Sequence, residues 1–375
     1  MSLTIAQFTA DLNRAGQQRV VVDLAKGFRS KGHRSLVCTT LSDGELEEEL
    51  KPAGIGYRRF NLSKNYDLRA VVPIMKYLRE QKIDVVITHG FYGSFIPRVS
   101  TLCARIPAFL HVEHNVSDQK RFYHVLINNF FSLFTDRIVC VSSKARESLL
   151  EIEKPVSSKV AVIPNGLNTE RFSGSTTINR PRDVKRVGIV GRFYEQKGHR
   201  YFIDAAALIL QRDKAVEFVF VGDGPLRSDM EKRVLKAGIE AHCHFYGERS
   251  DIGELLRTFD VFVLSSLWEG LSISLLEAQF LGVPSVVTAV GGNPEIIRDG
   301  WNGLLVPPEN PEQLASAVLR VLGDEALQRK FSENAKRLVA EKYTVDTMVN
   351  AYLELISELV KKPKNGWSGS YPKLL

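Results

Sequence analysis

Short apolar runs rich in β-branched residues alternate with stretches of helical periodicity along most of the chain. In the first half the strand-like runs are residues 5–8, 35–40, 57–61, 84–89, 109–113, 137–142 and 159–163. Helical patterns lie between most of them, for example over residues 18–30 and 68–81. The rhythm restarts in the second half, with strand-like runs at residues 186–190, 217–221, 244–246, 261–264, 285–288 and 304–306. Apolar strands separated by helices are typical of parallel sheets covered on both faces, so an α/β fold is predicted.

The chain has 375 residues, more than one hydrophobic core usually supports, so two domains are expected. Residues 173–183, SGSTTINRPRD, are polar and aperiodic and are interpreted as a linker. We therefore predict Rossmann-like domains over residues 1–172 and 184–360. The chain reads as helical from Pro308 to about residue 361, with a last helix that could return to the N-terminal domain, and residues 361–375 read as an irregular tail.

Composition fits a soluble enzyme, with 44% hydrophobic and 25% charged residues. The start lacks a basic segment followed by an apolar run, and no window supplies the roughly 18 apolar residues of a membrane span. No signal peptide or membrane-spanning segment is predicted. Three of the four cysteines, Cys38, Cys103 and Cys140, lie in apolar runs and are expected to be small core residues, which fits a reducing cytoplasmic compartment.

The net charge of +7 is unevenly distributed. Residues 1–180 hold 25 Lys and Arg against 17 Asp and Glu, which gives +8, and residues 181–375 therefore carry −1. A basic excess in one half suggests an acidic partner for that half, such as anionic lipid, an acidic acceptor or nucleic acid. Charge alone does not choose among them.

A strand-to-helix loop in the second half carries two cations. Residues 190–198 read VGRFYEQKG and lie between a predicted strand and a helical stretch that begins near His199. Arg192 and Lys197 are therefore expected at the carboxyl end of the sheet, where open α/β folds bind ligands. Two cations there suit a diphosphate, whose charge they would neutralise. Two solvated surface charges are the alternative interpretation.

A second loop, SSLWEGLSISLLEA at residues 265–278, combines a potential anion site with two carboxylates. A helix is predicted to begin near Leu271, so N–H groups would point out of its N-terminus, where anions bind, from Gly270, Leu271 and Ser272. Glu269 and Glu277 are eight residues apart, which is roughly 12 Å along a helix axis. This is wider than the ~5–9.5 Å between paired glycosidase carboxylates. The two are therefore expected to hold hydroxyls at opposite ends of one ligand.

A third segment, TAVGGNPE at residues 288–295, has a Gly-Gly pair that permits close approach of the backbone to a ligand. With it, the sequence resembles the retaining glycosyltransferases of the GT-B fold, family GT4. The resemblance rests on the spacing Glu269-x7-Glu277 in EGLSISLLEA, and on GVPSVVTAVGGNPEII, GRFYEQKG, FVGDGP, FYGE and PNGLNTERF. It covers nearly the whole chain, and the joint order and spacing of these motifs make it specific.

The resemblance implies two Rossmann-like domains facing each other across a cleft, and transfer of sugar from a nucleoside-diphosphate donor. It also implies that Arg192 and Lys197 bind the donor diphosphate, that Glu269 contacts the transferred sugar and that Glu277 holds the ribose. The N–H groups of residues 270–272 would touch phosphates or sugar. The other implied donor-side positions are Asn165 and Gly166 near the domain crossing, and Tyr246 and Gly247 beside the base. Tyr246 could equally be a core aromatic at a strand end.

The first half departs from the family pattern. Family members often carry Gly-Gly-x-Glu/Gln before the first helix, whereas this chain has RAGQ, with Ala15 where the first glycine is usual. Gly16 is left as a phosphate or acceptor contact. The segment HVEHN resembles the acceptor-side histidine motif, which implies that His114 lies at the reaction centre by the transferred sugar. A histidine that caps the strand end is the alternative, and His111, on the opposite face by strand alternation, is expected to be structural.

No Asp-x-Asp triplet, the motif by which many glycosyltransferases of the other major fold carry a metal, occurs in the sequence. With Arg192 and Lys197 in place, we expect neither a metal nor another cofactor, and activity that survives EDTA. The family implies retention of anomeric configuration. No carboxylate is an obvious covalent nucleophile, so the working hypothesis is a front-face route in which the leaving phosphate helps to deprotonate the acceptor.

Two rival functions have partial support. An NAD-binding oxidoreductase could use Gly222 and Gly224, but the fingerprint G-x-G-x-x-G would need glycine where Arg227 stands. A nucleic-acid-binding protein would explain the basic half, yet no such motif is present, and nucleic acid is not an expected partner.

The expected substrates are a hexose or N-acetylhexosamine donor, with a UDP-sugar favoured over GDP-mannose, and a glycan or lipid-linked acceptor of cell-surface polysaccharide or lipopolysaccharide synthesis. For a lipid-linked acceptor, Lys120, Arg121 and the aromatic run over residues 122–134 could rest on an anionic membrane. The alternative is a helix packed inside the domain. The expected location is the cytoplasm, with peripheral contact to the inner face of the membrane.

Overall fold

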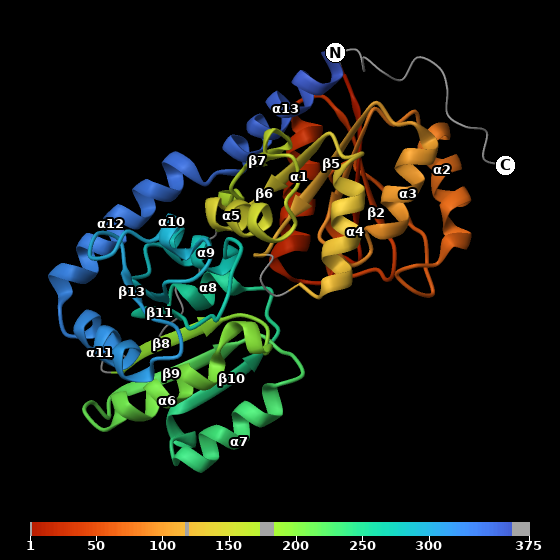
Figure 1. Ribbon diagram of the computed structural model, residues 1–375. Coiled ribbons are helices and arrows are strands. Elements are labelled where there is room, and N and C mark those ends of the chain that lie inside the picture. Colours follow the sequence, from red (N-terminus) through yellow and green to blue (C-terminus); the bar gives the residue numbers. More distant parts are fainter. Residues whose placement is uncertain (1, 117–119, 173–183, 362–375) are drawn as a thin grey trace.

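The computed structural model describes residues 2–116, 120–172 and 184–361, which form two α/β domains (Figure 1). The first is built on a seven-stranded sheet in the order β3-β2-β1-β4-β5-β6-β7, with all neighbouring pairs parallel. Its strands are β1 (Thr4–Thr9), β2 (Arg34–Thr39), β3 (Gly56–Arg59), β4 (Val85–His89), β5 (Ala108–Glu113), β6 (Arg137–Cys140) and β7 (Val160–Val162). Its α-helices are α1 (Gly16–Ser30), α2 (Val71–Glu80), α3 (Phe95–Ala104), α4 (Phe122–Ser132) and α5 (Ser143–Ile152).

The second domain is built on a six-stranded parallel sheet in the order β10-β9-β8-β11-β12-β13. Its strands are β8 (Lys185–Val190), β9 (Val216–Val221), β10 (Cys243–Gly247), β11 (Val261–Leu264), β12 (Ser285–Thr288) and β13 (Leu304–Val306). The helices of this half are α6 (His199–Leu210), α7 (Arg227–Ala237), α8 (Ile252–Leu256), α9 (Ile273–Leu281), α10 (Asn293–Ile296), α11 (Pro311–Leu322), α12 (Glu325–Lys342) and α13 (Val345–Lys361).

Each strand-like run of the sequence coincides with a strand, and the predicted fold class is confirmed. The central strands are apolar along their whole length because helices cover both faces; β4 and β5 are buried at every position. Helix α1 shows the complementary pattern, since Val20, Leu24 and Phe28 recur at intervals of four and enter one core.

Strand order reverses at one place in each sheet. The chain moves from β1 to β2 on one side and places β4 on the other, and β8 is flanked in the same way by β9 and β11. Loops leaving the carboxyl ends of strands at such a switch point form a crevice that favours ligand binding. The expected site is therefore set by topology: the loops after β1, β4 and β5 in one domain, and after β8 and β11 in the other.

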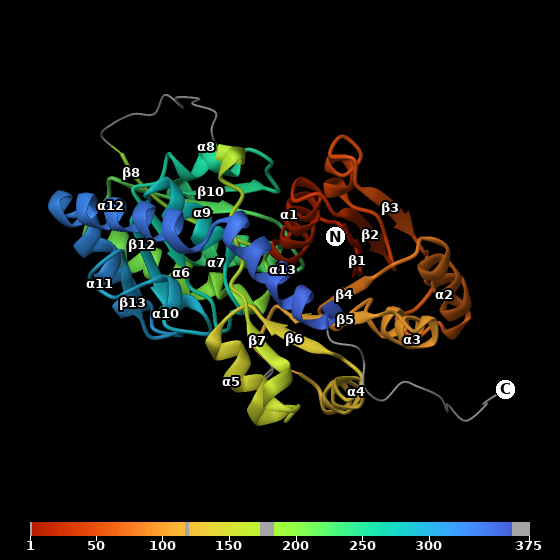
Figure 2. The same cartoon turned by 90° about the horizontal axis from the view of Figure 1, so that it is seen from above.

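The chain passes between the domains twice. Residues before the linker already lie against the second domain, because Phe172, at the end of the short 3₁₀ helix η5 (Thr169–Phe172), packs against the ring of Phe280. Helix α13 returns to the first domain and packs on α1 (Figures 1 and 2), where Tyr352 meets Phe28 edge to face. A Cβ on Gly27 would come within 2.2 Å of Val349, so glycine permits this close approach.

One core prediction is wrong. Cys38 and Cys140 are buried, as expected, but Cys103 is exposed. Cys103 lies in the last turn of the amphipathic helix α3, which ends at Ala104 and is followed by Arg105 in the left-handed conformation. Although the residues around Cys103 are apolar, its own side chain lies on the exposed face of the helix.

Candidate active site

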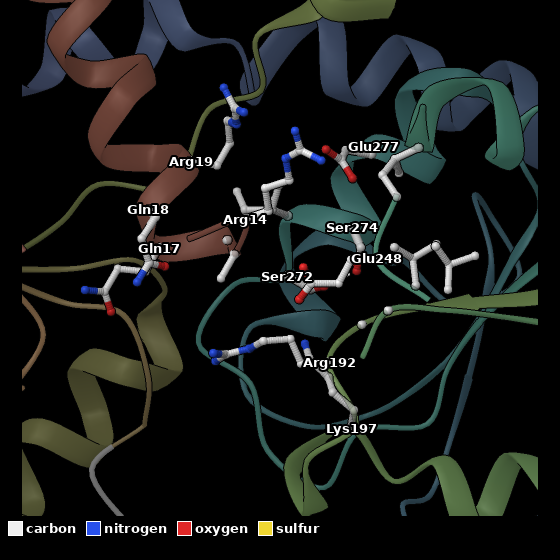
Figure 3. Close-up of a pocket in the computed structure, with 18 of the residues that line it drawn as sticks. Arg14, Gln17, Gln18, Arg19, Arg192, Lys197, Glu248, Ser272, Ser274 and Glu277 are labelled. Atoms are coloured by element: carbon white, nitrogen blue, oxygen red, sulfur yellow. Dashed lines mark hydrogen bonds between the residues drawn. The ribbon is translucent and has the colours of Figure 1, made fainter. Parts of the chain in front are cut away.

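A cavity of about 410 Å³ lies between the carboxyl ends of the two sheets. Both domains line it: Arg14, Gln17 and Arg19 come from the start of α1 and the loop before it, and Ser272, Ser274 and Glu277 from α9 and its cap (Figure 3). Arg192 and Lys197 enter from the loop after β8 (Figure 3). The cavity thus occupies the switch points of both sheets.

The three motif segments of the second half converge on Glu269. Lys197, the last residue of the 3₁₀ helix η6 (Glu195–Lys197), donates from Nζ to Glu269 Oε1 at 2.5 Å. Ser266 donates from its hydroxyl to the same oxygen at 2.6 Å, and Glu269 is only 4% exposed. The Gly-Gly segment covers the other side, since a Cβ on Gly291 would come within 1.8 Å of the Glu269 carbonyl oxygen. Burial of a carboxylate is costly without hydrogen bonds and a counter-charge, and Ser266 and Lys197 supply them.

Arg192 is in a different situation from Lys197. It is exposed at the cavity wall, with its guanidinium 4.9 Å from the centroid of the Tyr194 ring. Stacking on an aromatic ring restrains the side chain without using its N–H donors. Arg192 therefore keeps its N–H donors available for an anion, whereas the ammonium group of Lys197 is paired with Glu269.

The helix start predicted near Leu271 is two residues too early. Helix α9 begins at Ile273, and its N-cap is Ser272, whose hydroxyl accepts from the N–H of Leu275 at 3.4 Å. Gly270 and Leu271 precede the cap, so their N–H groups are not part of the helix N-terminus. The helical rise used for Glu269 and Glu277 also does not apply, because Glu269 lies outside the helix.

Gly270 instead marks a close approach of the two domains. A Cβ at this position would lie 1.8 Å from the carbonyl oxygen of His114 and 2.6 Å from its carbonyl carbon. Gly16, the first residue of α1, also faces the second domain, where an added Cβ would meet Ile273 at 3.3 Å. Both glycines let the backbone of one domain reach the other beside the cavity.

Glu277 lies on α9 and is 6% exposed. Arg171 of η5 places Nη1 3.4 Å from Glu277 Oε1, and Arg19 of α1 adds a second favourable charge. Burial nevertheless dominates and raises the pKa of Glu277 above its ordinary value. The same cause lowers the pKa of His114 to about 4, so this histidine is neutral near pH 7.

Comparison with known proteins decides the family. Residues 14–171 match the family model described as Glycosyltransferase Family 4, and residues 175–338 match the model described as Glycosyl transferases group 1. An uncharacterized glycosyltransferase of Methanocaldococcus jannaschii is 30% identical over 362 residues, which span 88% of this chain and 92% of that protein. The chain belongs to the group 1 glycosyltransferases of family 4.

Other relatives of this glycosyltransferase agree. The UDP-Gal:alpha-D-GlcNAc-diphosphoundecaprenol alpha-1,3-galactosyltransferase of Escherichia coli is 27% identical over 317 residues, 80% of this chain and 82% of that protein. A crystal structure of HepE from Anabaena in complex with UDP and glucose superposes with a TM-score of 0.85 at 20% identity, covering 95% of this chain and all of that chain. The rival interpretations as oxidoreductase or nucleic-acid-binding protein give way to an enzyme of the glycosyltransferase class.

Most of the glycosyltransferase residues singled out from sequence lie together. The cavity is lined by Gly16, His114, Asn165, Arg192, Lys197, Glu269, Leu271, Ser272 and Glu277. Asn165 also donates from Nδ2 to the carbonyl oxygen of Leu271 at 3.2 Å, which joins the crossing segment to the loop before α9.

Four predicted positions do not line the cavity, and one of them is Gly270, which lies beside it at the domain contact described above. Gly166 packs against the start of α13, where a Cβ would come within 2.3 Å of the Thr344 carbonyl oxygen. Tyr246 is 39% exposed at the end of β10, and Gly247 accepts a hydrogen bond from the N–H of Gly222 at 2.8 Å. The lining at this side comes from the following residues, Glu248, Arg249 and Ser250.

Sequence reasoning missed several charged residues of the cavity, namely Arg14, Arg19, Glu49, Arg171, Asp223 and Glu248. Arg171 stands inside the motif PNGLNTERF, which was the available signal. Arg19 gives none locally, because its partner Glu49 is 30 residues away and binds it through two hydrogen bonds of 2.9 and 2.7 Å. Within the described ranges, no group of three or more His, Cys, Asp or Glu residues is placed to hold a metal ion.

Proposed function

We propose that this glycosyltransferase moves a hexose or an N-acetylhexosamine from a nucleoside-diphosphate sugar to a glycan or lipid-linked acceptor in cell-surface polysaccharide or lipopolysaccharide synthesis. The observation that carries the proposal is the order of groups along the cavity. Ser272 and Ser274, at the N-terminus of α9, lie between Glu277 on one side and Arg192 and Lys197 on the other (Figure 3). This order suits ribose hydroxyls, a diphosphate and a sugar in succession.

A UDP-sugar is the favoured donor, and GDP-mannose is the alternative. The Escherichia coli relative is named for UDP-galactose and a diphosphoundecaprenol acceptor, and HepE was crystallised with UDP and glucose, which supports the first choice. In the proposed complex Glu277 accepts hydrogen bonds from the ribose and Arg192 contacts the diphosphate. The Lys197–Glu269 pair faces the transferred sugar. The remaining N-terminal-domain lining, including Gly16, faces the acceptor or the phosphates.

The proposed reaction retains the anomeric configuration by a front-face route. The bond between the anomeric carbon and the donor phosphate oxygen breaks, while the acceptor oxygen bonds to the same face of that carbon. The acceptor proton passes to the leaving phosphate oxygen. Negative charge grows on the diphosphate during this step, and Arg192 and the α9 N-terminus would stabilise it from fixed positions. Lys197 adds positive charge in the same region while it holds Glu269.

Protein cations are proposed to do the work that a divalent metal does in other glycosyltransferases. Activity is therefore expected to persist in EDTA. Complete loss of transfer in EDTA, restored by Mg²⁺ or Mn²⁺, would contradict this part of the proposal.

A thermal-shift panel tests the donor site. UDP, GDP, ADP and NAD⁺ would be compared with UDP-glucose, UDP-N-acetylglucosamine and GDP-mannose, each with and without EDTA. A ligand at about 100 times its Kd adds roughly 2.7 kcal/mol of stability, which raises the melting temperature by several degrees. A shift with UDP or GDP compounds that ignores EDTA supports the proposal and identifies the base. A shift with NAD⁺ alone, or with none of them, contradicts it.

The stereochemistry is tested separately. NMR of the product's anomeric proton distinguishes retention from inversion.

Contact with an anionic membrane surface is proposed for the N-terminal domain. Helix α4 has an unusual distribution of side chains: it buries His124 and Asn128 and exposes Phe122, Leu126 and Phe130 by 76%, 53% and 56%. An exposed apolar face on a basic domain suits the interface of an anionic bilayer, as for an interfacial helix. Within the described ranges no helix is both long and apolar enough to cross a bilayer.

Lys120 does not belong to that surface, contrary to the expectation from sequence. Its Nζ lies 2.8 Å from Glu113 Oε2 and also forms an ion pair with Glu153. The ammonium group of Lys120 is therefore buried between two carboxylates, whose negative charge it balances. Arg121, exposed at the N-cap of α4, remains the basic residue at this end of the face. The exposed face of α4 and Arg121 support the proposal that the enzyme works at the inner face of the cytoplasmic membrane.

A further inference from the structure

His114 is the end of a buried chain of hydrogen bonds that crosses three neighbouring strands. Its Nε2 lies 3.0 Å from Nδ1 of His89, at the end of β4. Nε2 of His89 lies 3.0 Å from Oε1 of Gln7 on β1, and Gln7 donates from Nε2 to the carbonyl oxygen of Val21 at 3.1 Å. Gln7 and His89 are completely buried, whereas His114 lines the cavity.

The carbonyl of Val21 fixes the direction of every bond in this chain. A carbonyl can only accept, so the amide group of Gln7 must direct its NH₂ there and its oxygen towards His89. An amide oxygen also only accepts, so the proton of His89 is on Nε2. Burial holds the pKa of His89 well below its ordinary value, so this ring carries one proton and its Nδ1 is an acceptor.

The same logic reaches His114. Because Nδ1 of His89 accepts, Nε2 of His114 must carry the proton of that ring. His114 is also neutral near pH 7, so its Nδ1 carries a lone pair and no proton. Without this series of hydrogen bonds, a neutral histidine is free to adopt either tautomer, and its Nδ1 could then donate or accept.

We propose that Gln7 and His89 are positioning residues that hold His114 in the neutral Nε2–H tautomer, so that its Nδ1 accepts a hydrogen bond from a hydroxyl of the transferred sugar. An acceptor at this position selects a neutral, hydroxyl-bearing sugar. It disfavours a donor that would bring an ionised carboxylate there, because two groups of lone pairs would face each other in a site of low dielectric constant. The ligand part of this inference rests on the proposed function; the tautomer part does not.

The tautomer can be measured directly on the full-length protein without any substrate. Long-range ¹H–¹⁵N NMR of histidine-labelled protein distinguishes a protonated ring nitrogen from an unprotonated one. The chain has 8 histidines, and His114→Gln and His89→Asn assign the two signals by their disappearance. Both rings are expected to be neutral with the proton on Nε2 at pH 7. A proton on Nδ1 of His114, or a charged ring, overturns the proposal.

Two variants test whether the hydrogen bonds from Gln7 through His89 set the tautomer of His114. Gln7→Met keeps the length and buried volume of the side chain but removes the acceptor, so His89 and His114 are expected to become mixtures of tautomers. Gln18→Met is the control and should leave both rings unchanged, because Gln18 lies on α1 and donates to Asp11 rather than to the hydrogen-bonded series. A pure Nε2–H His114 in folded Gln7→Met would overturn the role of Gln7, and if that variant does not fold, the wild-type tautomer still decides.

The ligand part is tested by adding the nucleotide sugar that raises the melting temperature most. The Nδ1 resonance of His114 is expected to shift with that sugar nucleotide and to stay in place with the nucleotide alone. Transfer by the Gln7→Met enzyme should fall about tenfold or more in kcat/KM, mainly through kcat. An Nδ1 resonance that ignores the sugar overturns the contact. If no nucleotide sugar binds at all, the proposed function fails while the tautomer result stands.

Discussion

Arg171 and Glu277 meet at the boundary between the two halves of the chain, with Nη1 of the arginine 3.4 Å from Oε1 of the glutamate. Arg171 belongs to the segment that passes from the first domain to the second, and Glu277 is fixed on α9. The pairing places the carboxylate that is proposed to bind ribose next to the crossing segment. In the proposed complex, nucleotide binding would therefore be linked to the position of the crossing segment through one buried carboxylate.

Glu277→Gln is expected to weaken binding of UDP by about 10- to 100-fold. A hydrogen bond to a charged group contributes about 1.5–3 kcal/mol, and 1.4 kcal/mol corresponds to a factor of ten. Isothermal titration calorimetry with UDP measures the change. Glu325→Gln, at an exposed position at the start of α12, is the matched control and should bind normally. Equal affinities in the two variants would remove Glu277 from the donor site.

Arg192→Ala is expected to lower kcat by about 100-fold or more, because a preorganised positive group next to the leaving diphosphate contributes on that scale. Lys197→Ala should have an effect of the same order and should also leave Glu269 without its cation. Arg200→Ala, at the exposed second residue of α6, is the control. Steady-state kinetics with the identified donor provides the measurement, and a change of less than threefold in both active-site variants would refute the assignment.

Gly270→Ala is expected to reduce kcat/KM by at least tenfold, because its methyl group would overlap the His114 carbonyl and force the domains apart. Gly323→Ala is the control, since Gly323 has an ordinary φ of −91° and meets only Leu319 at 3.3 Å. Kinetics and melting temperature should be measured together. An active Gly270→Ala enzyme with wild-type kinetics would mean that this approach of the domains is dispensable.

Asp23 gives the clearest pH dependence of stability. It lies on α1 at 2% exposure, and burial raises its pKa to about 6. The folded state keeps its proton while the unfolded chain releases it near pH 4, so the contribution of Asp23 to the free energy of unfolding decreases as pH rises from about 4 to 6, by up to about 3 kcal/mol. Asp23→Asn should lack this decrease. Urea unfolding between pH 4 and 7 measures it, with exposed Asp229→Asn as control; identical slopes in wild type and Asp23→Asn would contradict the assignment.

Replacing the exposed face of α4 by serine at Phe122, Leu126 and Phe130 is expected to lower binding to anionic vesicles by tenfold or more, since each side chain loses apolar area that the bilayer would cover. Leu235→Ser removes an equally exposed apolar residue, 62% exposed, from the second domain and should have no effect. Co-sedimentation with phosphatidylglycerol-containing and neutral vesicles measures the difference. No preference of the wild-type protein for anionic vesicles would count against membrane contact.

The fold could be read from sequence because it follows from local patterns. Apolar runs bounded by helices specify parallel strands, and the motifs after β8 and β11 follow strands directly, so their place at the sheet edge was predictable. The predicted start of α9 is too early because the helix begins after the residue whose side chain caps it, which is Ser272. Hydrophobic periodicity does not show which residue is the cap.

The errors concern pairings between distant segments. Lys120 was assigned to the surface because its partners, Glu113 and Glu153, come from β5 and the end of α5, and only the folded chain brings them together. Arg19 was missed for the same reason, because its partner Glu49 is 30 residues away, whereas Arg171 stands inside a motif that offered a local signal. For α4 the sequence leaves two interpretations open, packing inside the domain or contact with a membrane. An aromatic run has the same pattern in both cases.

The two crossings between the domains meet at a single backbone bridge, where the N–H of Leu167 donates to the carbonyl of Tyr343 at 2.7 Å and the N–H of Val345 donates to the carbonyl of Leu167 at 3.2 Å. The two crossing segments are therefore joined to each other by backbone hydrogen bonds. Helix α13 begins at this bridge and packs on α1 of the first domain. Helix α13 thus stabilises the first domain although it follows the second domain in sequence, and it does so away from the residues that line the cavity.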